Sequence, residues 1–207
     1  MFTMKIIKSS FSEAGQESFV INILDGKKNG YFVEIGAYHS TLASNTYILE
    51  NNYNFKGVGL EIDSARADEY NLNRKNPCIK SDAMKFDYRS YLAANNFPSQ
   101  IDYLQVDIEP ALNTFRALLR IMSTGYRFSI ITFEHDGFRN HRNKIIRKIA
   151  KTYLRIRGYI LVVANVSNPK APLHYYEDWY LDSKIFSKSF IKLNKKQDVC
   201  SSELFNL

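Results

Sequence analysis

Short apolar runs alternate with helix-like segments along most of this chain, and this alternation constrains the fold more than any other feature of the sequence. The run at residues 31–35 is followed by a glycine, and the run at 57–61 comes next, after one helix-compatible segment. This is the spacing of a βαβ unit. Repetition of the unit predicts an α/β fold with a mostly parallel central sheet and helices on both faces.

The same reading of apolar runs and flanking residues gives the individual elements. The predicted strands are residues 31–35, 57–61, 78–80, 102–106, 127–133 and 158–164. The predicted helices are residues 43–50, 64–74, 112–122 and the basic segment 139–157. The periodicity weakens after residue 167, and we expect one edge strand there, at 184–191.

A chain of 207 residues is long enough for one domain with a substantial core. We expect an N-terminal leader at 1–29, an α/β core at 30–166, and a C-terminal loop with the edge strand at 167–207. Cys78 and Cys200 are too few for a disulfide framework or a zinc site. No segment has the pattern of a signal peptide or a membrane span, so we expect a soluble, cytoplasmic protein.

The formal net charge of +7 favours encounter with anionic partners. Much of the excess lies in residues 139–157, where lysines and arginines are interleaved with isoleucine and leucine. This segment has two interpretations, an amphipathic helix with a solvated basic face or a phosphate-binding surface. Nucleic acid is a partner that the charge permits but does not by itself imply.

Acids follow three successive predicted strands. Glu34 and Gly36 end the first, Glu61 ends the second with Asp63 as its rival, and Asp82 follows the third. Ligands of open α/β sheets lie beyond the carboxyl ends of the strands. A carboxylate there can accept both hydroxyl protons of a ribose, whereas a solvated loop acid is the plain alternative for each one. Neither G-x-G-x-x-G nor a P-loop is present, which favours a nucleoside ligand without a pyrophosphate.

Several segments, taken in order, carry a family resemblance. They are residues 15–17, 30–37, 44–46, 49–50, 57–61 and 101–109. Together they resemble the FkbM-type family of class I S-adenosylmethionine-dependent methyltransferases, whose fold is Rossmann-like. The resemblance implies S-adenosylmethionine as methyl donor, S-adenosylhomocysteine as product, and O-methylation of a hydroxyl on a sugar, glycan or small metabolite.

The resemblance also implies a donor site along the strand ends. Its residues would be Gln16, Glu34, Gly36, Glu61, Ile62, Ser81, Asp82, Ala83 and Asp107. The leader 1–29 would then fold over the cofactor as a lid, 30–166 would bind it, and 167–207 would lie on the acceptor side. Ser40 stands where many class I enzymes carry a further glycine, which implies a tighter loop or a slightly displaced donor.

The predicted chemical centre lies where the fourth and fifth strands end, at Asp107 and at Glu134, His135 and Asp136. Methyl transfer needs an aligned acceptor and a base for its proton, and His135 is the candidate base. Asp107, Glu134 and Asp136 could instead hold a divalent metal ion through oxygen ligands. A third interpretation is that Glu134 and Asp136 cap the basic helix and pair with Arg139.

An aromatic and acidic cluster at residues 175–180 contains Trp179 and Asp178. It could stack on a sugar acceptor and bind its hydroxyls, or it could fold back to cover the core. Two other functions stay open beside sugar or metabolite O-methylation. One is methylation of nucleic acid such as RNA, which the net positive charge favours. The other is a non-catalytic nucleoside-binding protein of the same fold.

Overall fold

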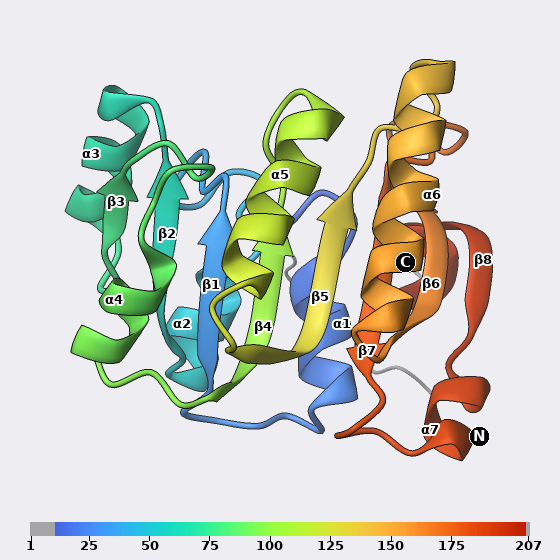
Figure 1. The fold of residues 1–207 in the computed structure, drawn as a ribbon, viewed down its shortest axis with the longest axis horizontal. Coiled ribbons are helices and arrows are strands. Elements are labelled where there is room, and N and C mark those ends of the chain that lie inside the picture. Colours follow the sequence, from blue (N-terminus) through green and yellow to red (C-terminus); the bar gives the residue numbers. More distant parts are fainter. Residues whose placement is uncertain (1–10, 206–207) are drawn as a thin grey trace.

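A computed structural model describes residues 11–205 of the chain. Its centre is one eight-stranded sheet in the order β3-β2-β1-β4-β5-β7-β6-β8 (Figure 1). The strands are β1 Tyr31–Ile35, β2 Lys56–Glu61, β3 Cys78–Lys80, β4 Gln100–Val106, β5 Arg127–Glu134, β6 Tyr159–Ser167, β7 Glu177–Asp182 and β8 Lys196–Cys200. The helices are α1 Gln16–Ile23, α2 Tyr47–Tyr53, α3 Ser64–Asn73, α4 Tyr88–Ala94, α5 Ala111–Met122, α6 His141–Ile156, α7 Lys188–Leu193 and α8 Ser201–Phe205.

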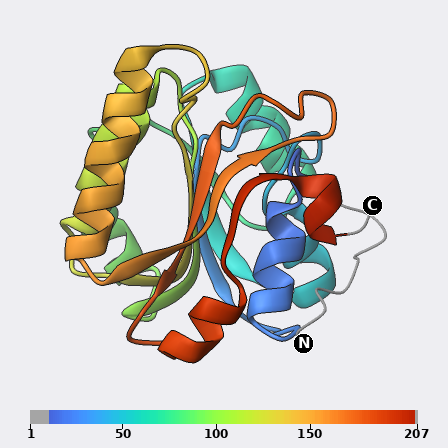
Figure 2. The ribbon, with the colours of Figure 1, turned by 90° about the vertical axis from the view of Figure 1, so that its right-hand side faces the viewer.

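All strand pairings are parallel except the two that β7 makes with β5 and β6. Helices α4, α5 and α6 cover one face of the sheet, and α1, α2 and α8 lie on the other (Figure 2). The prediction of a mostly parallel α/β sheet with helices on both faces is therefore confirmed. Within residues 11–205, no helix has the length and apolarity needed to cross a membrane.

Each face of the sheet carries its own hydrophobic core, because successive side chains of a strand point to opposite faces. Val33 and Leu104 pack into the core under α4, α5 and α6. Their neighbours Phe32 and Tyr103 pack into the core under α1 and α2. The central strands are buried on both sides, which explains why they read in the sequence as continuous apolar runs.

The C-terminal part differs from the prediction. Residues 184–191 form no strand, since Ser187 caps α7 by accepting a hydrogen bond from the backbone N–H of Phe190 at 3.2 Å. The edge strand is β8, and the cluster at 175–180 supplies β7 in the interior of the sheet. All six residues of β7 are buried, so the strand has no polar–apolar alternation. Its acids Asp178 and Asp182 are paired with arginines, which lets a charged segment occupy the interior.

Four of the helices were not predicted, namely α1, α4, α7 and α8. Helix α1 lies in the segment expected to be a leader, and α4 follows Asp87, whose side chain accepts a hydrogen bond from the backbone N–H of Ser90. Helix α2 begins at Tyr47, four residues after the predicted start. The first ten residues of the expected leader lie outside the described residues.

Trp179 is the residue on which we expect the stability of the sheet to depend most. It is fully buried, and its ring centroid lies 4.5 Å from that of Phe19 on α1. Replacement of a buried tryptophan by alanine costs about 3–5 kcal/mol. We therefore expect Trp179→Ala to lower the free energy of unfolding by this amount in urea titrations. Leu193→Ala, at a site that is 78% exposed, is the control, and equal losses in both variants would contradict the assignment.

Candidate functional site

The carboxyl ends of β1 and β4 approach each other so closely that only glycine fits at position 36. Gly36 has a φ of +87°, and a Cβ built on it would lie 1.7 Å from the carbonyl oxygen of Asp107. The backbone N–H of Asp107 donates to the carbonyl of Ile35 at 2.9 Å. Gly36 therefore serves the tight junction of two strands, and it leaves the backbone open to a ligand at the strand ends.

The end of β2 is organised by Glu61. One carboxylate oxygen accepts a hydrogen bond from the backbone N–H of Tyr38 at 3.0 Å, and the other accepts from the N–H of Asp63 at 2.9 Å. Asp63 itself caps α3 by accepting from the N–H of Arg66. Of the two rival acids, Glu61 is thus the one that links the loops after β1 and β2. The side chain of Ile62 between them is 71% exposed.

Ser81, Asp82 and Ala83 follow β3 at the same edge of the sheet. The N–H of Ser81 donates to the carbonyl of Glu61 at 2.9 Å, which fixes the spacing between the ends of β2 and β3. The Asp82 side chain accepts from the N–H of Met84 and lies 3.4 Å from Lys85. Asp82 is half-buried, and Ala83 is buried.

Glu34, in contrast, turns away from this edge into the interior. Its carboxylate accepts hydrogen bonds from the hydroxyl of Thr46 at 2.7 Å and from the backbone N–H of Asn45 at 3.2 Å. Burial raises its pKa to about 7. Ser40 is also buried, and its hydroxyl donates to Glu69 on α3 at 2.5 Å. Both residues hold the loop that follows β1.

A cavity of about 340 Å³ opens at the ends of β1, β4 and β5, and we call it the strand-end cavity. Its lining includes three predicted site residues that come from distant parts of the chain, Gln16, Asp107 and Glu134. The full lining is Glu13, Gln16, Gly36, Tyr38, Ala43, Asn45, Asp107, Glu134, Asp136, Phe138, Arg139, Asn168, Ala171, His174 and Tyr176. Four of these residues are acids and only Arg139 is a formal cation, so the cavity favours a ligand with positive charge.

Two polar atoms in the lining have no hydrogen-bond partner among the described residues. They are the Oδ1 atom of Asn45 and the hydroxyl oxygen of Tyr176. Buried polar atoms in folded proteins are almost always hydrogen-bonded, to protein, water or a ligand. Their presence in one cavity therefore indicates that polar groups of a ligand or ordered water complete the site.

Asp107 and Glu134 form a hydrogen-bonded carboxyl pair in the strand-end cavity. Burial raises the pKa of Asp107, although the hydrogen bond from Glu134 opposes the rise. Burial also raises the pKa of Glu134, and the adjacent charge of Asp107 raises it further. Two carboxyls this close oppose each other's ionisation, which makes each ionised carboxylate a stronger base than an ordinary one.

His135 does not line the strand-end cavity. Side chains alternate along a strand, so the residue after Glu134 points to the other side. The His135 ring is fully buried, its Nδ1 accepts from the backbone N–H of Gly137 at 2.9 Å, and its Nε2 lies 3.5 Å from Asp178. The predicted base His135 therefore does not reach this cavity, whereas the side chains of Asp107 and Glu134 line it.

The metal interpretation does not fit this geometry. Asp136 pairs with Arg139 at 2.8 Å, as the third interpretation expected, which leaves only Asp107 and Glu134 of the three predicted ligands. No group of three or more histidine, cysteine, aspartate or glutamate side chains is placed for a metal ion anywhere in residues 11–205. The cap of α6 is Asn140, whose side chain accepts from the N–H of Asn143.

The predicted acceptor residues Trp179 and Asp178 lie inside the sheet. The indole N–H of Trp179 donates to Glu177 at 2.7 Å, and its ring has no exposed face for stacking on a sugar. Asp178 accepts two hydrogen bonds of 2.7 Å from the guanidinium of Arg147. Burial alone would raise the pKa of Asp178, but the nearby imidazole of His135 and the hydrogen-bonded guanidinium of Arg147 hold it below the ordinary value.

Sequence reasoning missed Asn45 and His174 in the cavity lining, whereas Tyr176 belongs to the cluster 175–180 that was offered as an acceptor-binding segment. Asn45 lies in the segment 44–46, which carries part of the family resemblance, and this was the one sequence feature that could have identified it as a site residue. His174 and Tyr176 precede β7, and they reach the cavity because β7 pairs with β5 and returns the chain to the strand ends. No local sequence pattern predicts the pairing of β7 with β5.

No protein-family model matches this chain, and no curated protein matches it in sequence. Solved structures match its fold. A Clostridium thermocellum protein described as an rRNA methylase superposes with a TM-score of 0.56 at 12% identity, over 84% of this chain and 97% of that chain. The human methyltransferase 10 domain-containing protein gives 0.53 at 10% identity, over 86% and 84%.

A Streptococcus agalactiae protein of the NADB-Rossmann superfamily gives a TM-score of 0.54 at 12% identity, over 97% of this chain and 75% of that chain. At such low identities the likeness concerns the fold and not the substrate. The fold of this chain is the Rossmann-like α/β fold that these structures share.

Glu177 provides a test of the buried acids around the site. It accepts hydrogen bonds from Trp179 and from Gln16, and burial raises its pKa from 4.5 to about 8. The native state therefore keeps a proton that the unfolded chain loses, so the stability from Glu177 is present at low pH and is lost as pH rises through its native pKa.

We expect the urea midpoint of the wild type to fall between about pH 5 and about pH 8.5. Glu177→Gln should show a smaller fall, because glutamine does not titrate. Glu203→Gln on α8 is the control and should behave like the wild type. Identical falls in the wild type and Glu177→Gln would show that this carboxyl does not carry the raised pKa.

Proposed function

We propose that this chain is an S-adenosylmethionine-dependent methyltransferase of the FkbM type that methylates a hydroxyl on a sugar, glycan or small metabolite. The observation that carries the proposal is the strand-end cavity, where an ionisable carboxyl pair and two unpartnered polar atoms meet beside Gly36. Its place at the carboxyl ends of the strands is where folds of this kind bind their ligands. The fold shared with methyltransferase structures supports the same class of reaction.

The residues present suit this donor. Glu61 is 8% exposed at the end of β2, and its free lone pairs can accept the hydroxyl protons of a ribose. The Oδ1 atom of Asn45 can accept a hydrogen bond from an ammonium group, and the acids of the cavity favour the positive charge of the donor. Asp82 and the backbone of Ala83 remain the proposed contacts of the base.

When bound, the donor supplies an electrophilic methyl group on a positively charged sulfur. The task of the protein is to align a hydroxyl with that carbon and to accept the hydroxyl proton. The Asp107–Glu134 pair is placed to take the proton, because both side chains line the cavity and burial raises the pKa of each carboxyl. The acidic lining opposes a second negative charge and so helps the carboxyl to retain the proton.

Donor binding is the first measurement. We expect S-adenosylmethionine and S-adenosylhomocysteine to bind the wild type in isothermal titration, and Asn45→Ala to weaken both by about tenfold, the effect of one hydrogen bond to a charged group. Because Asn45 Oδ1 has no partner among the described residues, the variant should keep its melting temperature. Glu61→Ala should weaken binding further.

Asp68→Ala, an exposed acid on α3, is the matched control for both variants and should bind like the wild type. Absence of binding by the folded wild type would overturn the methyltransferase proposal. Unchanged affinity in Glu61→Ala would remove the ribose contact while leaving the proposal in place.

The base is tested by turnover. We expect Asp107→Asn to lower methyl transfer to a hydroxyl acceptor by about 100-fold or more, the size of a general-base contribution, while affinity for S-adenosylhomocysteine changes far less. The assay follows labelled methyl groups from the donor into a panel of sugars and glycans. Asp68→Asn is the control, and an unchanged rate in Asp107→Asn would refute the assignment.

A further inference from the structure

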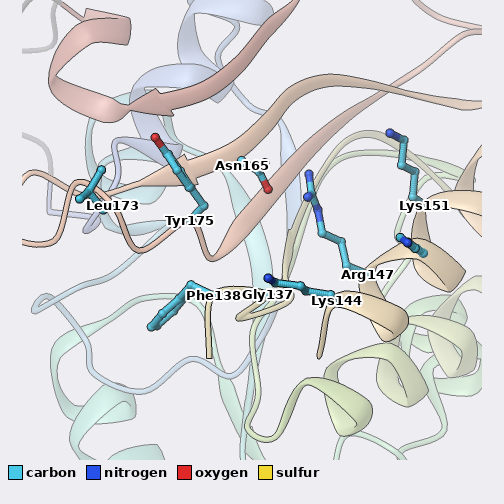
Figure 3. Close-up of a pocket in the computed structure, with 9 residues that line it drawn as sticks. Gly137, Phe138, Lys144, Arg147, Lys151, Asn165, Leu173 and Tyr175 are labelled. Atoms are coloured by element: carbon cyan, nitrogen blue, oxygen red, sulfur yellow. The ribbon is translucent and has the colours of Figure 1, made fainter. Parts of the chain in front are cut away.

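A second cavity lies beside the strand-end cavity, and we call it the basic cavity. It has a volume of about 560 Å³ and opens between α6 and the loop that joins β6 to β7. Lys144 and Lys151 rise from α6 on one side, and Tyr175 and Leu173 lie on the other (Figure 3). Lys148 lines the same side, so lysines at 144, 148 and 151 follow one stripe of the helix.

The charge of this stripe is not neutralised within the fold. Within residues 11–205, no carboxylate lies within 4.0 Å of the ammonium group of Lys144, Lys148 or Lys151. Arg147 also lines the cavity, but Asp178 holds its guanidinium and compensates its charge. The basic cavity therefore carries three uncompensated cations on one wall, which favours an anionic ligand.

The two cavities adjoin at Phe138, which lines both of them. Its ring stacks on the imidazole of His174, with 4.5 Å between the ring centroids, and His174 belongs to the strand-end cavity. A single ligand can therefore place one end near the Asp107–Glu134 pair and another end among the lysines. One cavity is acidic and the other basic, so the two ends must differ in charge.

We propose that the basic cavity binds a phosphate group of the acceptor, and that the acceptor belongs to the class of sugar phosphates or sugar diphosphates. Lysine ammonium groups bind phosphate oxygens as point charges, and the cavity volume lies in the range of small-molecule sites. Phe138 and Tyr175 offer ring surfaces to the sugar or base that carries the phosphate. The phosphate site is argued from the lysines alone, and only the identification of its ligand as the methyl acceptor rests on the proposed function.

RNA is the competing source of phosphate. RNA and a small phosphate ester are expected to contact different sets of lysines. A third cavity, of about 470 Å³, shares Lys151 with the basic cavity and adds Lys195 and Lys196 at the start of β8. A bound RNA strand would engage the lysines of both cavities, because its charges repeat along the chain. A sugar diphosphate would engage the basic cavity alone.

The test uses isothermal titration at low ionic strength, without methyl donor, with three probes: inorganic pyrophosphate, UDP-glucose and a uridine 20-mer. The proximal variant is Lys144→Gln with Lys148→Gln, and the distal variant is Lys195→Gln with Lys196→Gln. Lys188→Gln with Lys192→Gln on α7 is the matched control, because it removes equal charge and lines none of the three cavities.

We expect pyrophosphate and UDP-glucose to bind the wild type, and the proximal variant to weaken both by at least about tenfold. The distal and control variants should keep wild-type affinity. Absence of binding by the wild type, or equal affinity in the proximal variant, would overturn the proposal. Tight binding of the 20-mer that the proximal and distal variants weaken equally would also overturn it, in favour of RNA. Because the titration contains no donor, its failure is distinguishable from a failure of donor binding.

Discussion

The geometry of the strand-end cavity depends on the hydrogen bonds that the buried guanidinium of Arg74 donates. Its side chain is fully buried at the end of α3, and its Nε donates to Glu50 on α2 at 3.0 Å. Its other nitrogens donate to the carbonyl of Ser40 at 2.9 Å and to the hydroxyl of Thr46 at 3.0 Å. Thr46 in turn donates to Glu34 on β1. One cation thus ties two helices, a strand and the loop that presents Asn45.

Loss of any partner of Arg74 in this network would destabilise the fold. A buried charge that loses its partner costs about 3–5 kcal/mol, so every member constrains the others. Glu34 illustrates the consequence. A carboxylate at a strand end was predicted to contact the donor, but in the fold it holds the loop whose residue Asn45 lines the strand-end cavity. The role of Glu34 is therefore to position Asn45 rather than to bind a ligand itself.

A second buried pair sets the electrostatic character of the other side. Asp178 on β7 holds Arg147 of α6 by two hydrogen bonds of 2.7 Å. This contact and the buried face of α6, with Ile146, Ala150 and Leu154, orient the helix so that its lysine stripe lines the basic cavity. Arg142 is exposed and lines none of the three cavities, so the interpretation of α6 as a helix with a solvated basic face holds for this residue. The lysine stripe favours the phosphate-binding interpretation.

Much of the core of the fold could be predicted from the sequence alone. Strands that are buried on both faces read as continuous apolar runs, and β1, β3 and β5 appeared close to their observed bounds. The acids and the glycine after these strands followed from the same reading, because parallel strands place their carboxyl ends at one edge. Local order of this kind needs no distant contact. Within the described residues, β7 and α7 were the main errors, since Glu177, Asp178 and Asp182 concealed an interior strand.

The sequence by itself determined the α/β class and the acids that stand at the carboxyl ends of the strands, because each depends on residues that are neighbours in the chain. Only the tertiary structure decided which of those side chains meet. It paired Asp107 with Glu134, turned His135 away from the cavity, and brought Tyr176 to the strand ends through the pairing of β7 with β5. These outcomes depend on side-chain direction, on burial and on contacts between distant segments, which no local pattern of residues records.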